Sequence, residues 1–214
     1  MVSNKNKSML LNFNEIVNKY GTPKGIIHIG AHLMEERNDY LSKNVSNIIW
    51  IEANPKVYSE IEFVNSNGKE KTFNYAISDV DNQFVKLNVA NNGQSSSILA
   101  LEKHKVHHPH VYVTEVVDVE TKRIDTLFNE NGLDIENYDF VNIDIQGAEL
   151  LAIKGFGDLI GRVRYIYTEI NTNFLYENCA LVGEIDEYLE RFGFKRAETS
   201  MTPFEWGDAL YIRN

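Results

Sequence analysis

The sequence predicts an α/β fold, with a mostly parallel sheet, helices on both faces and an antiparallel hairpin at its C-terminal end. Three short apolar runs, 25–29, 48–51 and 140–143, alternate with segments of helical spacing, which is typical of strands buried in a parallel sheet. Each run ends at a small or acidic residue, and such positions lie at the carboxyl edge, where open α/β sheets bind ligands. The last two runs, 194–198 and 209–213, predict the antiparallel pair.

Composition limits the classes of protein to which this chain can belong. Its 214 residues suit one domain, which we expect to span 1–214. The 31 acidic and 21 basic residues give a net charge of −10, which argues against nucleic acid as a partner, because proteins that bind phosphate backbones concentrate Lys and Arg. No apolar run approaches the ~20 residues needed to span a bilayer, so no membrane span is expected. The polar first residues and the single Cys179, which excludes an internal disulfide, favour a cytoplasmic protein.

The first third of the chain predicts alternating helices and strands. Apolar residues at helical spacing before Gly21 place a short helix in an N-terminal extension that covers 1–24. Asn54 followed by Pro55 is a typical helix start, because Asn caps helices and proline fits their first position. In chain order we expect a helix over 13–20, a strand over 25–29, a helix over 35–43, a strand over 48–51, a helix over 55–64 and a strand over 72–76.

The middle of the chain is its least regular part. Strands are expected over 84–89 and 115–122, where apolar and polar residues alternate. Between them, residues 90–113 contain a polar loop and four closely spaced histidines, which suggest a zinc site. Because no cysteine lies nearby and Pro109 interrupts the spacing, we favour a mobile active-site flap that carries solvated histidines. The histidines are His104, His107, His108 and His110.

The C-terminal half is organised around residues 138–155. The apolar run stops at Asp144, and a helix follows Gly147 and ends at Gly155. A carboxylate in this position either presents chemistry at the sheet edge or caps the helix, and the segment alone does not distinguish the two roles. The other elements expected are a helix that opens over 124–128, a strand over 164–171, a helix over 182–192 and the terminal pair, joined by 199–207 across the same edge.

The run from Asp139 to Gly155, Asp-Phe-Val-Asn-Ile-Asp-Ile-Gln-Gly-Ala-Glu-Leu-Leu-Ala-Ile-Lys-Gly, resembles the signature of the FkbM-family methyltransferases, which use S-adenosylmethionine. Four further motifs occur in the family's order: His-Ile-Gly-Ala-His at 28–32, Trp-Ile-Glu-Ala-Asn-Pro at 50–55, Asn-Tyr-Ala-Ile-Ser-Asp at 74–79 and Gly-Asp-Ala-Leu at 207–210. Several motifs in one order are more specific than any one alone. The resemblance implies a class I methyltransferase (Rossmann-like) fold and methyl transfer to a hydroxyl of a sugar, glycan or related small molecule.

The expected cofactor contacts follow partly from position and partly from the resemblance. Glu52 follows a buried strand, where a carboxylate can accept hydrogen bonds from both hydroxyls of a ribose, in NAD and in S-adenosylmethionine alike. The resemblance implies that the loop after 25–29 lies beside the methionine end of the cofactor. It also implies that Asp79 borders the adenine, although an Asx-type turn explains this residue nearly as well. The cofactor contacts expected are Gly30, Ala31, His32, Glu52, Ala53, Ser78, Asp79 and Asp144.

Methyl transfer to a hydroxyl needs a base, because a neutral hydroxyl is a poor nucleophile. Asp144 is the first candidate base and His32 the second. Alternatively, a divalent ion, Mg²⁺ or Mn²⁺, held by Asp144 with Glu169 or Asn171 would lower the pKa of the hydroxyl. The residues expected to contact the small-molecule or glycan acceptor are Gln146, Glu149, Asn171 and Trp206.

Two other functions remain open from the sequence. An NAD-dependent oxidoreductase would use Glu52 in the same way, but it would need a fuller glycine fingerprint, and Met34 stands where a further glycine is often found. A non-catalytic cofactor-binding module would keep the fold and lose the base, against which Asp144 argues. The residues make no prediction of oligomeric state.

Overall fold

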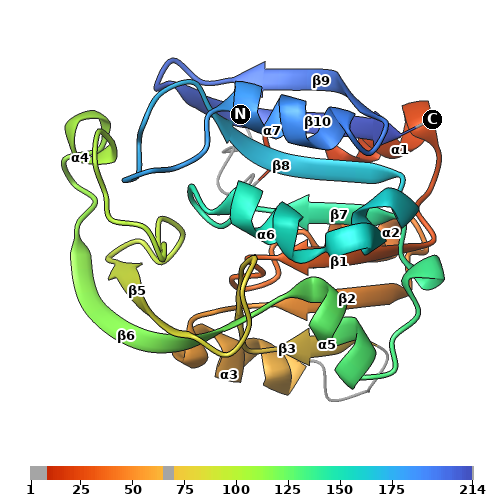
Figure 1. Cartoon of the computed structure of the whole chain (residues 1–214), viewed down its shortest axis with the longest axis horizontal. Helices are drawn as coiled ribbons and strands as arrows, with labels where there is room; N and C mark the ends of the chain where they lie inside the picture. The colour runs from red at the N-terminus through yellow and green to blue at the C-terminus, as the bar shows by residue number, and fades with distance from the viewer. Residues whose placement is uncertain (1–8, 65–69, 214) are drawn as a thin grey trace, which may run out of the picture.

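The computed structural model of the chain describes residues 9–64 and 70–213, and it has the predicted α/β architecture (Figure 1). Residues 1–8 of the expected N-terminal extension lie outside this part. One seven-stranded sheet has the order β3-β2-β1-β7-β8-β10-β9. Its first five strands are parallel, and β10 runs antiparallel to both β8 and β9, so the predicted C-terminal hairpin is confirmed. The strands are β1 (Gly25–Ile29), β2 (Asn47–Ile51), β3 (Lys71–Phe73), β7 (Phe140–Ile143), β8 (Tyr165–Asn171), β9 (Phe194–Met201) and β10 (Trp206–Arg213).

The order of the sheet reverses between β1 and β7. From β1 the chain continues outward to β2 and β3, and it returns to place β7 and β8 on the other side of β1. Both β1 and β7 are buried at every position, which explains their continuous apolar runs. A reversal of this kind opens a crevice at the carboxyl ends of the strands. Gly30 has φ +86 at this point, and a Cβ there would lie 1.9 Å from the Asp144 carbonyl oxygen, so only glycine fits.

Helices cover both faces of the sheet. Apolar side chains of α1, α2 and α3 pack on one face around Trp50 and Phe140, and those of α5, α6 and α7 pack on the other around Ile27 and Val141. The two clusters lie on opposite faces of the sheet, and the crevice lies at its carboxyl edge. The helices are α1 (Phe13–Tyr20), α2 (Arg37–Ser42), α3 (Pro55–Val64), α5 (Ile124–Glu130), α6 (Glu149–Gly155) and α7 (Val182–Glu190), with short 3₁₀ turns at Ile135–Asn137 and Gly157–Arg162.

A second, three-stranded sheet stands apart from the first. It consists of β4 (Ala76–Ile77), β6 (Val113–Lys122) and β5 (Phe84–Ala90), in that order. The strand expected over 72–76 therefore divides into β3 in the main sheet and β4 in the small one. Asn74 lies at the break, where its side-chain amide donates to the Glu52 and Ala53 carbonyl oxygens at 2.7 and 3.1 Å. The strands expected over 84–89 and 115–122 form, but they lie outside the main sheet.

The segment 91–112 between β5 and β6 lies beyond the ends of the parallel strands, at the left of Figure 1, and contains α4 (His104–His107). We call this segment the flap. The side chain of His104 lies outside the described part of the structure. Where the structure describes the chain, it contains no helix of the length and apolar character needed to cross a membrane.

Two sets of predicted boundaries differ from the structure. The helix expected over 35–43 spans only Arg37–Ser42, and Glu36 is its N-cap residue; in the turn before it, His32 and Met34 have positive φ angles. The terminal strands are longer than expected, since β9 continues to Met201 and β10 begins at Trp206. The connection expected over 199–207 is therefore a tight turn, and Trp206 is a strand residue.

Candidate active site

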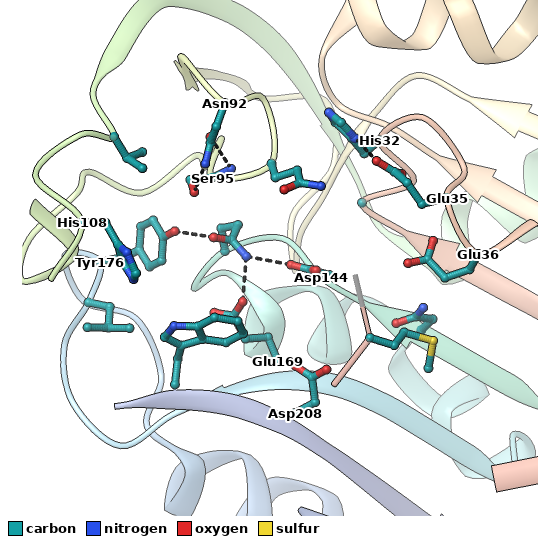
Figure 2. A pocket seen from close by; sticks show the side chains of 18 of the residues that line it. His32, Glu35, Glu36, Asn92, Ser95, His108, Asp144, Glu169, Tyr176 and Asp208 are labelled. Carbon is teal, nitrogen blue, oxygen red and sulfur yellow. Dashed lines mark hydrogen bonds and ion pairs between the residues drawn. The ribbon is translucent and has the colours of Figure 1, made fainter. Parts of the chain in front are cut away.

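A cavity of about 500 Å³, which we call the large cavity, opens at the carboxyl edge of the main sheet (Figure 2). This volume is within the usual range for small-molecule sites. Its walls come from the ends of β1, β7 and β8, from the turn before α2, from β10 and from the flap. Of the site residues predicted from the sequence, Gly30, His32, Asp144, Gln146, Glu169 and Trp206 line it.

Gln146 joins two carboxylates at the centre of the large cavity. Its amide nitrogen donates to Asp144 Oδ1 at 2.8 Å and to Glu169 Oε2 at 2.7 Å, and its amide oxygen accepts from the Tyr176 hydroxyl at 2.5 Å. The tyrosine fixes the orientation of the amide, because a hydroxyl that donates must face the oxygen. Burial raises the pKa of both Asp144 and Glu169, and the charge of Asp144 raises that of Glu169 further.

Asp144 does not cap the following helix. The residue that precedes α6 is Ala148, and no side chain caps the helix there. The side-chain hydrogen bond of Asp144 runs instead to Gln146, toward the cavity. The structure therefore excludes the helix-cap interpretation of this carboxylate.

Glu149 stabilises the loop before α6 through hydrogen bonds to its backbone. It is 1% exposed, and its Oε1 accepts from the backbone N–H groups of Ile145 at 3.2 Å and Gly147 at 2.9 Å. Burial raises its pKa to about 7. Glu149, which was predicted to contact the acceptor, is not among the residues that line either cavity.

His32 is the second candidate base, and its surroundings make it a poor one. Its Nδ1 lies 2.6 Å from Glu35 Oε1, and this hydrogen bond raises the pKa of the imidazole. Because this hydrogen bond favours the protonated ring, which has no lone pair left to accept a proton, it argues against His32 as the base. The backbone N–H of His32 donates to Glu52 Oε2 at 2.9 Å, which ties the first loop to the end of β2.

A second, narrow cavity of about 70 Å³ lies beside the large one. Glu52 and Ala53 line it together with an apolar wall from Tyr75, Ile77 and Leu87, and flap residues 93–98 cover it. Glu52 Oε1 accepts from the Asn54 backbone N–H at 2.7 Å, so both of its oxygens face the loops at this edge. The two cavities share four lining residues, Gly30, His32, Gln94 and Asp144.

Besides Glu149, four predicted site residues do not line either cavity. Ala31 is buried, and its backbone N–H donates to the Ile51 carbonyl at 3.0 Å. Ser78 and Asp79 lie near Arg123, which donates to the Asp79 carbonyl at 2.8 Å. Asn171 is 1% exposed, and its amide nitrogen is 3.4 Å from Glu169 Oε1. The roles assigned to these four residues stay predictions.

No group of three or more His, Cys, Asp or Glu side chains within residues 9–64 and 70–213 is arranged to hold a metal ion. His108 and His110 line the large cavity with ring centroids 5.9 Å apart, whereas His107 Nε2 is 3.1 Å from Glu205 Oε2. His108 and His110 therefore form part of the cavity wall, and His107 attaches the flap to Glu205.

Sequence reasoning missed the polar floor of the large cavity. His28, Asn142 and Tyr167 are in register on β1, β7 and β8, so their side chains share one face of the sheet. His28 and Asn142 are polar residues in otherwise apolar strands, and this pattern could have identified them. Glu36 and Asp208 line the same region and are also buried. We call this region, made of His28, Glu36, Asn142, Tyr167 and Asp208, the deep end.

Residues 21–196 match the model of the methyltransferase FkbM domain, which is most of the chain. The chain belongs to the FkbM methyltransferase family. A curated relative, the 2-O-methyltransferase NoeI of Sinorhizobium fredii (strain NBRC 101917 / NGR234), is 36% identical over 98 residues. The match spans 46% of this chain and only 40% of the length of NoeI.

Solved structures support the fold of this FkbM chain. A protein of the NADB-Rossmann superfamily from Streptococcus agalactiae superposes with a TM-score of 0.52 at 10% identity, over 98% of this chain and 72% of its own. An uncharacterised protein from Listeria monocytogenes serotype 4b gives 0.50 at 9% identity, over 95% and 68%. At such identities the likeness concerns the fold alone, and with the family it confirms the class I methyltransferase (Rossmann-like) architecture.

Proposed function

We propose that this protein is an S-adenosylmethionine-dependent O-methyltransferase that acts on a hydroxyl of a sugar, glycan or related small molecule. The proposal rests on one observation: the narrow cavity, which we assign to the nucleoside, and the large cavity, which we assign to the acceptor, share four lining residues. These are Gly30, His32, Gln94 and Asp144. Methyl transfer needs two ligands in adjoining sites with the reacting atoms aligned at the junction. Membership in the FkbM family and the 2-O-methyltransferase activity named for NoeI agree with it.

The residues around the narrow cavity fit the cofactor. Glu52 stands at the end of β2 with a carboxylate that can accept further hydrogen bonds from ribose hydroxyls, and Tyr75, Ile77 and Leu87 provide an apolar wall for a base. Gly30 brings the backbone close at the junction without a side chain. Because the cavity measures only about 70 Å³, entry of a nucleoside requires flap residues 93–98 to move outward.

The cofactor supplies an electrophilic methyl group when bound, and the protein's own residues prepare the acceptor. Asp144 lies at the junction and accepts the proton of the acceptor hydroxyl. Burial raises its pKa, which brings the carboxylate closer to the strength that a base needs near neutral pH. Gln146 keeps the carboxylate in position, and Tyr176 keeps the amide from turning.

A direct base is favoured over a metal-assisted mechanism. The Gln146 amide nitrogen lies between Asp144 and Glu169, where an ion held by both carboxylates would have to sit. Binding of Mg²⁺ or Mn²⁺ there would require this amide to leave two hydrogen bonds. Methyl transfer through Asp144 alone needs no such rearrangement.

Thermal stabilisation tests the proposal, because a ligand that binds only the native state raises the melting temperature. S-adenosylhomocysteine is expected to stabilise the protein and NAD is not. Incubation with isotopically labelled S-adenosylmethionine and pooled glycans should then give labelled product detectable by mass spectrometry. Stabilisation by NAD in place of S-adenosylhomocysteine would identify an oxidoreductase. Binding of S-adenosylhomocysteine by a protein that labels no acceptor would favour a non-catalytic module.

A further inference from the structure

We propose that the deep end of the large cavity binds a protonated amine, so that the acceptor is an amine-bearing sugar or polyol and not an anionic one. The proposal rests on the proposed function, because it takes the large cavity as the acceptor site. It concerns Glu36, Asn142 and Asp208, which line the cavity and are all buried. Figure 2 places Glu36 on the side of Asp144 opposite His108 and Tyr176, away from the flap.

Glu36 is a buried carboxyl whose nearest basic atom does not neutralise it. The side chain is 7% exposed, and His28 Nδ1 lies 3.9 Å from its Oε2, beyond hydrogen-bond distance. Burial lowers the pKa of His28 to about 4, so the ring carries no charge at neutral pH. Burial raises the pKa of Glu36 itself to about 8. The described residues form no ion pair with Glu36 other than this contact with His28, so a bound ammonium would be the cation that stabilises its carboxylate form.

Asn142 adds a buried oxygen without a partner. The His28 ring makes a hydrogen bond to the Gly30 backbone, and its Nδ1 lies 3.1 Å from the Tyr40 hydroxyl, which donates to it. The tyrosine oxygen in turn accepts from Asn142 Nδ2 at 2.8 Å. This chain of hydrogen bonds fixes the amide, and it leaves Oδ1 of a residue that is 2% exposed without a hydrogen-bond partner in the described part of the structure.

Asp208 completes the region with a second carboxyl that meets only neutral donors. It accepts from the Tyr167 hydroxyl and, at 2.7 Å, from the backbone N–H of Leu10. Burial raises its pKa to about 7. Both donors are neutral, so among the described residues no cation stabilises the carboxylate form of Asp208, and a bound ammonium would do so.

The charge around the whole cavity selects against anions. Five carboxyls line it, from Glu35, Glu36, Asp144, Glu169 and Asp208, and none of the described lining residues is Lys or Arg. A phosphate or carboxylate on the acceptor would therefore meet carboxyls and no Lys or Arg among the described lining residues. An ammonium group carries three N–H donors and can contact oxygens spread along a wall. A metal ion would need its ligands gathered in one place, and the described side chains form no such group of three.

Binding of three sugars of similar size tests the proposal: glucosamine, glucose and glucose 6-phosphate. Each is titrated into the full chain by calorimetry or NMR at about pH 7, where an ordinary amine is still protonated and Asp208 is partly ionised, with and without S-adenosylhomocysteine. Charge-assisted hydrogen bonds of an amine predict roughly ten- to hundredfold tighter binding of glucosamine than of glucose. Glucose 6-phosphate is expected to bind most weakly.

Two variants test whether the deep end causes the preference for glucosamine over glucose. Glu36→Gln keeps the size of the side chain but cannot form the carboxylate that a bound ammonium would stabilise, so the preference for glucosamine should fall by about tenfold, while Glu62→Gln on the exposed face of α3 leaves it unchanged. Asp208→Asn provides the same test if Glu36→Gln does not fold. Equal binding of glucosamine and glucose by the wild-type protein overturns the proposal, as does a preference that survives in both folded variants. Because the sugars are also measured without cofactor, failure of S-adenosylhomocysteine to bind would count against the proposed function and not against the amine site.

Discussion

Asp144, Gln146 and Glu52 illustrate how far single residues can be assigned from a sequence. The positions of Asp144 and Glu52 were predictable, because each follows a buried strand and strand ends meet at one edge of a parallel sheet. The orientation of Gln146 was not, because it depends on Tyr176, 30 residues further along the chain. For Glu149, position in the sequence was misleading. It lies beside the signature residues in sequence, yet its side chain points into the protein and holds their loop.

Replacement of Asp144 by Asn tests the base directly. The variant keeps the shape of the side chain but cannot accept the proton, so turnover should fall by roughly 10²–10⁴-fold while binding of S-adenosylhomocysteine is retained. Rates are measured on the true acceptor with and without EDTA. Near wild-type turnover of the folded variant would exclude Asp144 as the base. Loss of wild-type activity in EDTA, restored by Mg²⁺ or Mn²⁺, would establish the metal-assisted mechanism instead.

Replacement of Glu52 by Gln tests the nucleoside site. Glu52 also accepts from the His32 and Asn54 backbone N–H groups, so Gln, which keeps one acceptor oxygen, disturbs the loops less than Ala would. Loss of charge-assisted hydrogen bonds to ribose should weaken S-adenosylhomocysteine binding by about 1.5–3 kcal/mol. Calorimetry measures this, with the exposed Glu60→Gln on α3 as the control. The same affinity in the Glu52 and Glu60 variants would remove Glu52 from the site.

At the level of elements, the predicted strands are largely correct, but their membership in sheets was not predictable. Alternation of apolar and polar residues marks 84–89 and 115–122 as strands whether they join the main sheet or pair with each other. The short β4 separates from β3 because Asn74 bonds to backbone carbonyls at the break, an interaction that spans more than 20 residues. Helix α2 follows a turn in which His32 and Met34 have positive φ angles, a conformation that neither residue type predicts.

The flap is attached to the signature loop through Ser97. This residue is 2% exposed, and its hydroxyl donates to the Gln146 carbonyl at 2.7 Å and accepts from the Leu99 N–H at 3.0 Å. Ser97→Ala should therefore loosen the flap, and hydrogen exchange of the amides over 93–101 should speed up by about tenfold, since a hydrogen bond of ~1–1.5 kcal/mol is lost. Ser95→Ala is the matched control, because Ser95 bonds only to Asn92 within the flap. Equal rates of amide hydrogen exchange in the two variants would mean that Ser97 does not anchor the flap.

The molecule as a whole concentrates buried carboxyls at one edge of its sheet. Burial raises the pKa of Glu36 to about 8 and those of Asp208 and Glu149 to about 7, so each binds a proton more tightly in the folded state than in the unfolded chain. Their contribution to stability is present at low pH and is lost as the pH rises from their ordinary values through these raised ones. His28 acts in the opposite sense, but only between about 4 and 6.5, because above that range it is neutral in both states.

The ligand-free protein should therefore become less stable between about pH 6.5 and pH 8. His32, whose pKa is raised by its hydrogen bond to Glu35, contributes in the same direction. Urea denaturation at both pH values measures the change in the free energy of unfolding. Glu36→Gln should flatten the dependence and the exposed Glu62→Gln should not. A free energy of unfolding that rises over this interval would show that the deep-end carboxyls are not buried as described.

The two tryptophans of the chain give it an internal optical signal. Trp50 is fully buried beneath α2, where its indole nitrogen donates to Glu70 at 2.6 Å, so its emission should change only when the core opens. Trp206 lies at the start of β10 on the wall of the large cavity, where a bound molecule would displace water from its ring. Fluorescence of the native protein should therefore report acceptor binding through Trp206 while Trp50 gives a constant background. Trp206→Phe would leave a protein whose emission follows unfolding alone, so occupancy of the site and integrity of the fold become separable in one cuvette without any added label.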